Sequence, residues 1–294
     1  MRTKYNFAQL DQEIFKTLKN LDYHPEVIFD VGASNGYWSY LIHEIVPDAT
    51  YHLFEPLVDH IPTYTSIMES NLEKCPNFTL HKYGLGEKSE EKIMSIFSEG
   101  FGSTLLAMDE NQDLKKISVP ILTMDEAIKQ FNLPQPQVIK ADIQGFELAM
   151  LKGATATLPK TDVLLLEAWV YRGYTQECAL LLEIMNWLAK FNFYLWDYGD
   201  CFREDNGKLQ TIDCVFVNGK TLPSLAPLSS YEPKRDESIQ NLEAELESYK
   251  SELARYQSEN LNLAEEIVAM KSSKFWKLRR QWFKLKRWLG LKVS

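Results

Sequence analysis

Three acidic residues stand where short apolar runs of the chain end. Glu55, Asp142 and Glu167 each follow four mostly apolar residues. Such runs indicate strands, and a continuous apolar run is typical of a parallel strand that is covered on both faces. Ligands of parallel sheets bind beyond the carboxyl ends of the strands. We therefore expect Asp142 and Glu167 to end adjacent central strands, at the edge where a ligand would bind.

A glycine-bearing turn lies between residues 30 and 36 and separates one apolar run from a helical pattern. The order strand, glycine turn, helix and strand ending in Glu55 is typical of the first half of a nucleotide-binding βαβ unit. Gly32 allows a sharp turn and a close approach of the backbone to a ligand. The helix after Gly36 presents unpaired N–H groups. Glu55 could accept hydrogen bonds from both hydroxyls of a ribose.

Two glycines that a dinucleotide site would have are absent, and their absence indicates which class of nucleotide could bind. A dinucleotide site has glycines where this chain has Ser34 and Tyr37, and no phosphate-binding P-loop pattern occurs. The turn instead resembles the S-adenosylmethionine site of Rossmann-like methyltransferases, whose ligand has a ribose but no phosphates. The alternative is an ordinary strand–turn–helix. We expect cofactor contacts from these turns: Asp30, Gly32, Ser34, Asn35, Gly36, Glu55 and Asp142.

A second motif spans residues 137–154, with a turn at Gly145 and a helix that ends at Gly153. Together with residues 29–36 and 54–56, this segment resembles the FkbM family of methyltransferases. The most specific part is an aspartate-x-x-glycine-x-glutamate turn, followed by leucine-lysine-glycine-alanine. The resemblance covers roughly residues 25–218 and departs from the family at Ser34-Asn35. It implies S-adenosylmethionine-dependent O-methylation, in many relatives of a sugar or polyketide hydroxyl.

Three carboxylates are the candidate catalytic groups: Asp142, Glu147 and Glu167. A sugar hydroxyl is a poor nucleophile, so a base must take its proton or a metal must polarise it. The three side chains could supply the base or hold a divalent metal ion. The structural alternatives are that Asp142 caps a helix, Glu147 complements the helix dipole and Glu167 bonds a loop.

Aromatic residues follow the last of these carboxylates and allow two interpretations. Trp169, Tyr171 and Tyr174 could form a platform for a sugar ring, or they could belong to the core.

The order of apolar runs and helical patterns, together with the family resemblance, predicts an α/β fold with a Rossmann-like methyltransferase sheet flanked by helices. The sheet is mostly parallel, with an antiparallel last strand that follows a turn at residues 205–207. A helix over residues 7–21 and an extra strand pair at 94–97 and 117–122 are expected beside it.

The net charge of −9 is unevenly distributed over the 294 residues. Residues 271–294 contain nine Lys and Arg and no acid, which leaves −18 on the rest of the chain. An acidic body argues against nucleic acid as a partner. The four cysteines form no C-x-x-C pair, which indicates a reducing compartment. With a polar N-terminus and no long apolar run, the sequence predicts a cytoplasmic protein.

The chain divides by composition into four parts. We expect a methyltransferase domain over 1–220, a linker over 221–237, a coiled coil over 238–272 and a basic amphipathic tail over 273–294. Apolar positions from Ile239 to Met270 alternate by three and four, and Asn260 at an a position favours a parallel homodimer. A solvated single helix is the alternative interpretation of this segment.

The tail carries an apolar stripe whose phase does not continue the heptads: Phe275, Leu278, Trp282, Leu285 and Leu289. The stripe predicts peripheral association with the cytoplasmic face of a membrane, or else binding to another protein or to the acidic body.

Two functions remain open for the whole chain. One is an O-methyltransferase. The other is a catalytically idle scaffold that binds the cofactor and assembles glycan-building enzymes through the coiled coil.

Overall fold

The computed structural model describes residues 9–97, 100, 102–108, 114–173, 175–226, 248–252, 255–256, 258, 262, 268–270 and 274–289. The chain divides into two compact units, Met1–Leu228 and Ser229–Ser294. The first unit continues past residue 220, because Leu222 and Leu225 pack against its core. None of the described helices is both long enough and apolar enough to cross a membrane.

A seven-stranded sheet forms the centre of the first unit. Its order is β3–β2–β1–β7–β8–β10–β9, and all neighbouring strands are parallel except that β10 runs antiparallel to β8 and β9. This arrangement confirms the predicted mostly parallel sheet with an antiparallel last strand. The strands are β1 (Val27–Val31), β2 (Thr50–Phe54), β3 (Phe78–His81), β7 (Val138–Ala141), β8 (Val163–Trp169), β9 (Phe193–Arg203) and β10 (Leu209–Asn218).

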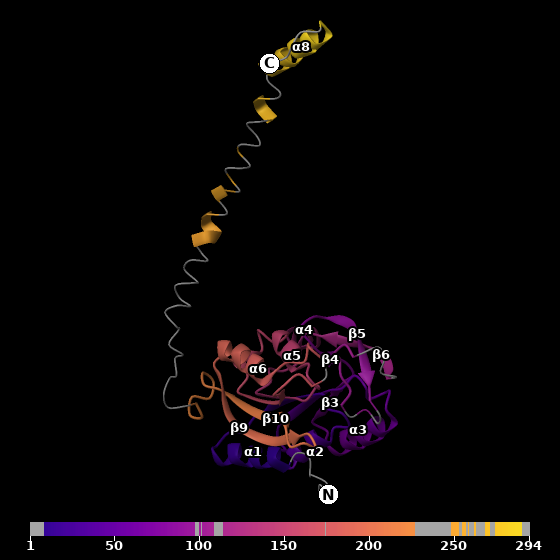
Figure 1. Cartoon of the computed structure of the whole chain (residues 1–294). Coiled ribbons are helices and arrows are strands. Elements are labelled where there is room, and N and C mark those ends of the chain that lie inside the picture. The colour runs from indigo at the N-terminus through magenta and orange to yellow at the C-terminus, as the bar shows by residue number, and fades with distance from the viewer. Residues whose placement is uncertain are drawn as a thin grey trace. The chain divides into compact units, whose positions relative to one another are not determined.

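Helices cover both faces of this sheet (Figure 1). One face carries α1 (Gln9–Asn20), α2 (Tyr37–His43) and α3 (Pro62–Lys74). The other carries α4 (Met124–Phe131), α5 (Glu147–Lys152) and α6 (Leu181–Leu188), with short 3₁₀ turns at Leu158–Lys160 and Ala189–Phe191. Successive side chains of a strand point to opposite faces, so Ile28 joins one core cluster and Phe29 joins the other. The apolar runs of the central strands are therefore continuous.

A second, three-stranded sheet lies beside the first. It contains β4 (Gly84–Leu85), β5 (Glu90–Ile96) and β6 (Lys115–Leu122) in the order β4–β6–β5. The antiparallel β5–β6 pair confirms the extra strand pair expected from the sequence, and each strand is longer than predicted. Thr123 is the N-cap of α4, since its side chain accepts a hydrogen bond from the Glu126 amide at 3.1 Å.

The strand order reverses between β1 and β7, and the turns that follow these two strands touch. Gly32, after β1, has a φ of +74°, and a Cβ on it would overlap the backbone oxygen of Asp142, after β7. Only glycine adopts this conformation readily and leaves room for the neighbouring backbone. The two motifs of the sequence therefore meet at the reversal point, where ligands of such sheets bind.

We predict that Gly32→Ala destabilises the fold much more than Gly207→Ala. Gly207 has a similar φ of +86°, but nothing lies within 4 Å of a Cβ built on it. Its replacement should cost only the conformational penalty, about 1–2 kcal/mol, whereas Gly32→Ala adds a backbone overlap and should cost at least about 3 kcal/mol. Urea unfolding of both variants measures the difference. Equal free energies of unfolding would contradict the close approach.

Candidate active site

Glu55 ties the end of β2 to the turn after β1. Its carboxylate is buried and accepts one hydrogen bond per oxygen, from the Ser34 amide to Oε2 and from the Leu57 amide to Oε1, both at 2.8 Å. Ser34 has a left-handed backbone, with a φ of +53°, and its amide donates to Glu55. Burial raises the pKa of Glu55 to about 7, although both amides oppose the shift.

Asp30 lies beneath the same turn and is fully buried. Its Oδ2 accepts a hydrogen bond from Ser39 Oγ at 2.7 Å, and its Oδ1 lies 3.1 Å from Lys140 Nζ. The Lys140 ammonium also donates to the Gly32 carbonyl oxygen at 3.2 Å. Burial alone would lower the pKa of Lys140, but the Asp30 and Asp142 carboxylates outweigh it and raise the pKa. Asp30 therefore supports the turn from inside the protein, through Ser39 and Lys140.

Asn35 and Gly36 shape the start of α2. Asn35 Oδ1 accepts a hydrogen bond from the Tyr37 amide at 3.1 Å, and the Asn35 carbonyl accepts one from Asn71 at 3.2 Å. Gly36 has a φ of +77°, and a Cβ there would lie 3.0 Å from Met68 Sδ. Asn35 and Gly36 therefore contact α2 and α3. Gly32 and Ser34 form the central part of the turn.

Gln144 joins two of the predicted catalytic carboxylates. Its Nε2 donates to Asp142 Oδ1 at 2.7 Å and to Glu167 Oε2 at 3.1 Å. Its backbone is left-handed, with a φ of +56°, and its carbonyl accepts a hydrogen bond from the buried Thr104 at 2.9 Å. Asp142 is exposed directly after β7, whereas Glu167 lies inside β8, two residues before its end. The side-chain amide of Gln144 therefore links the two carboxyl groups by hydrogen bonds.

The pKa values of the surrounding acids are raised. Burial raises the pKa of Glu167 well above its ordinary value, and the charges of Asp142, Glu147 and Asp213 add to this shift. Asp213 is the neighbour of Glu167 on β10, and burial, together with the charges of Asp11 and Asp142, raises its pKa to about 8. Glu167 and Asp213 therefore keep their protons to a higher pH than ordinary carboxyl groups.

Glu147 is the predicted catalytic carboxylate that is least accessible to solvent. It is the first residue of α5 and is completely buried, and its Oε1 accepts a hydrogen bond from the Ile143 amide at 2.9 Å. Burial raises its pKa to about 8. The spacing from Asp142 placed Glu147 in the correct turn but on its inner side, where it closes the loop between β7 and α5.

The structure does not support the metal site suggested for Asp142, Glu147 and Glu167. Throughout the described ranges, no group of three or more His, Cys, Asp or Glu side chains could hold a metal ion. The physical reason is the arrangement of the neighbours. The Gln144 amide donates to Asp142 and to Glu167, and Glu147 is completely buried and accepts a hydrogen bond from the Ile143 amide, so donors of the protein engage all three side chains.

The aromatic residues after Glu167 separate into different environments. Trp169 is buried in a small cluster with Leu106 and Cys178, which supports the core interpretation. Tyr171 donates a hydrogen bond to Glu204, and Lys208 Nζ lies 3.3 Å from the centre of its ring. Tyr174 lies outside the described residues. Trp169 is therefore not part of a sugar platform.

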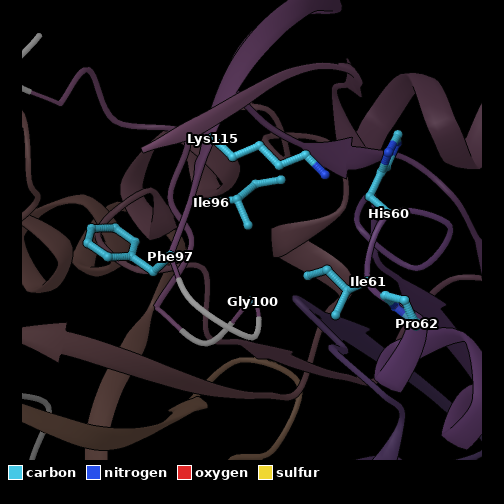
Figure 2. A pocket seen from close by; sticks show the side chains of 7 residues that line it. All are labelled: His60, Ile61, Pro62, Ile96, Phe97, Gly100 and Lys115. Atoms are coloured by element: carbon cyan, nitrogen blue, oxygen red, sulfur yellow. The ribbon is translucent and has the colours of Figure 1, made fainter. Parts of the chain in front are cut away.

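A pocket of about 340 Å³ lies at the start of α3 and beside the smaller sheet. Figure 2 shows the Lys115 side chain extending toward the side that carries His60. The pocket is lined by His60, Ile61, Pro62, Ile96, Phe97, Gly100 and Lys115. Gly100 packs against Ile61 and Tyr64, and Thr104, four residues later, binds the Gln144 carbonyl. One loop therefore connects this pocket with the carboxylate pair.

Fold and turns together define an α/β domain with a Rossmann-like ligand site at the reversal between β1 and β7. The family model described as the methyltransferase FkbM domain matches residues 30–195, and the chain belongs to this family. The matched range contains the glycine turn, Glu55 and both carboxylates held by Gln144. The family resemblance expected from the sequence is confirmed.

Among characterised proteins, the chain resembles the hexuronic acid methyltransferase AglP of Haloferax volcanii. The two are 24% identical over 158 residues, which cover 53% of this chain and 62% of that protein, less than two thirds of its length. Among solved structures, methyltransferase FkbM from Methylobacillus flagellatus KT is 20% identical with a TM-score of 0.41, covering 65% of this chain and 43% of that one. A precorrin-6y C5,15-methyltransferase from Geobacter metallireducens GS-15 is 15% identical with a TM-score of 0.41, covering 74% and 92%.

Residues that the sequence did not indicate include Lys140, Gln144 and Asp213. Lys140 was detectable, because it is the one charged residue in the buried run of β7. Asp213 likewise begins the apolar run of β10. Gln144 gave no comparable signal, since a polar residue in a glycine turn is ordinary. Its function depends on a side-chain position that only the folded turn provides.

Proposed function

We propose that this protein is an S-adenosylmethionine-dependent O-methyltransferase that acts on a hydroxyl group of a sugar, a glycan or a related metabolite. The main support is the meeting of two motifs. The turn held by Glu55 and the turn that carries Asp142 touch at Gly32, at the reversal point of the sheet. Membership of the FkbM methyltransferase family gives the chemistry of this arrangement.

The residues present fit the cofactor. Each Glu55 oxygen accepts one backbone hydrogen bond and has a second lone pair available, so the carboxylate could also accept both ribose hydroxyls. Gly32 has no side chain, so the cofactor could approach its backbone closely. When bound, S-adenosylmethionine supplies an electrophilic methyl group. Gly32, Ser34 and Glu55 are the residues that we propose to hold it, with Asp142 at the reacting end.

Asp142 is the proposed general base. It is exposed at the carboxyl edge of the sheet, whereas Glu147 is buried and Glu167 is half-buried. The Gln144 amide fixes the orientation of Asp142 by the hydrogen bond of 2.7 Å. An oriented carboxylate could accept the proton of an acceptor hydroxyl while that oxygen is aligned for in-line attack. Glu167 accepts a hydrogen bond from the same amide at 3.1 Å.

A sugar acceptor is supported by the similarity to a protein named for its action on hexuronic acid. A cytoplasmic location is supported by the four scattered cysteines, which form no C-x-x-C pair. The alternative function is a scaffold that binds the cofactor without turnover. Transfer of a labelled methyl group from S-adenosylmethionine to a hexuronic acid or to a glycan extract distinguishes an enzyme from a scaffold.

We predict that Asp142→Asn lowers turnover in this assay by about a hundredfold or more, the scale of a lost general base. Asp48→Asn is the control, because Asp48 is exposed before β2, at the opposite edge of the sheet. The Asp142 charge contributes to the raised pKa of Glu167, so Asp142→Asn should also lower the pKa of Glu167, as measured by NMR titration. Turnover equal to that of the control would exclude Asp142 as the base.

The coiled coil over 238–272 and the parallel homodimer remain proposals. Tyr249, Tyr256 and Met270 occupy predicted heptad positions and are exposed, as positions that a second chain would cover should be. The other predicted positions, Asn260 included, lie outside the described residues. The boundaries proposed for the linker, the coiled coil and the tail rest on the sequence pattern, and the first compact unit extends to Leu228, past the start of the linker predicted over 221–237.

We predict that a chain truncated after Leu228 is a folded monomer, whereas the full chain is a dimer. This end point retains Leu222 and Leu225, which pack against the core and keep the first unit intact. Light scattering gives the mass of both proteins in solution. A truncated protein that still measures as a dimer would show that the first unit itself forms the interface.

A further inference from the structure

The helix α8 (Lys274–Trp288) presents large apolar side chains to solvent. Its exposed stripe contains Leu278, Trp282, Leu285 and Leu289, with exposed fractions of 64%, 57%, 46% and 55%. Their spacing of four, three and four residues places them on one side of a helix. The Leu289 amide donates to the Leu285 carbonyl at 3.0 Å and so continues the helical pattern. An apolar stripe of this kind needs an apolar surface to cover it.

Positive charges border this stripe on both sides. Residues 274–288 contain seven Lys and Arg and no acid. At about 100° per residue, Arg279 and Lys286 lie along one border and Lys277 and Lys284 along the other. Arg279 stacks on Trp276, with its Cζ 5.4 Å from the ring centre, and Trp276 lies on the side away from the stripe. The helix therefore has an apolar centre between two cationic edges.

We propose that α8 binds the surface of an anionic lipid bilayer and lies parallel to it. The stripe would enter the boundary between headgroups and acyl chains, and the cationic edges would meet anionic headgroups on both sides. Trp282 is suited to this depth, because tryptophan concentrates at membrane interfaces. The helix has 15 residues, fewer than the roughly 20 that a spanning helix needs. Charge complementarity selects an anionic surface over a neutral one.

The predicted dimer would strengthen this attachment. A single weak anchor gives marginal and reversible membrane binding, whereas two linked anchors bind much more tightly. A dimer carries two copies of α8 on one particle. The proposal for α8 does not depend on the methyltransferase activity, so the two can fail independently.

Flotation of the full-length protein with vesicles tests the proposal. One set of vesicles contains phosphatidylcholine alone, and the other also contains phosphatidylglycerol. We expect flotation with the anionic vesicles and at least tenfold weaker partitioning into the neutral ones. Higher salt should weaken the anionic binding, since exposed charges are screened. Deletion of residues 271–294 should abolish flotation, while circular dichroism shows that the remaining chain is folded.

Two matched variants locate the binding surface on the helix. Trp282→Ala, within the stripe, should lower partitioning by about tenfold, whereas Trp276→Ala, on the far side, should lower it less than about threefold. Replacing Lys277 and Lys284 with Gln should reduce anionic binding about fivefold for each charge. Failure to float with either vesicle would overturn the proposal and favour an acidic protein partner. Equal binding to both vesicles, or binding that survives the deletion, would also overturn it.

Discussion

The buried ion pair between Asp30 and Lys140 is the interaction on which the site depends. It joins β1 to β7, the two strands between which the order of the sheet reverses. Lys140 also binds the Gly32 carbonyl, so one ammonium group fixes both the strand pair and the turn above it. Removing one partner of such a pair leaves an uncompensated buried charge and costs about 3–5 kcal/mol. The pair therefore sets where the backbone of Gly32 approaches Asp142.

Several carboxyl groups lie near this ion pair, and their negative charges must be stabilised by hydrogen-bond donors or removed by protonation. Glu55 is compensated by two backbone amides, and Asp142 and Glu167 by the side chain of Gln144. Asp213 and Glu147 are compensated less, and burial raises both pKa values to about 8. Hydrogen-bond donors fill the role that a cation would have at a metal centre. An oriented carboxylate with protonated neighbours is suited to accept a proton.

The sequence allowed the central elements to be predicted because they obey local rules. Apolar runs indicated β1, β2, β7 and β8, and the acids Glu55 and Asp142 directly after β2 and β7 indicated the carboxyl edge. The antiparallel ending followed from the turn before β10. The side of the turn that a residue faces was not predictable in the same way. The positions of Gln144 and Glu147 depend on how the loop between β7 and α5 folds: Thr104 donates to the Gln144 carbonyl, and the Ile143 amide donates to Glu147.

The most direct test of the proposed cofactor site is calorimetric titration of S-adenosylmethionine into the folded protein and into its Glu55→Ala variant. We expect the protein to bind the cofactor and the variant to bind it roughly 10–100-fold more weakly, because hydrogen bonds to a charged acceptor contribute about 1.5–3 kcal/mol. Glu73→Ala, an exposed change on α3, should bind like the unaltered protein. No binding by the folded protein, or equal affinity in the Glu55 variant, would contradict the proposed site.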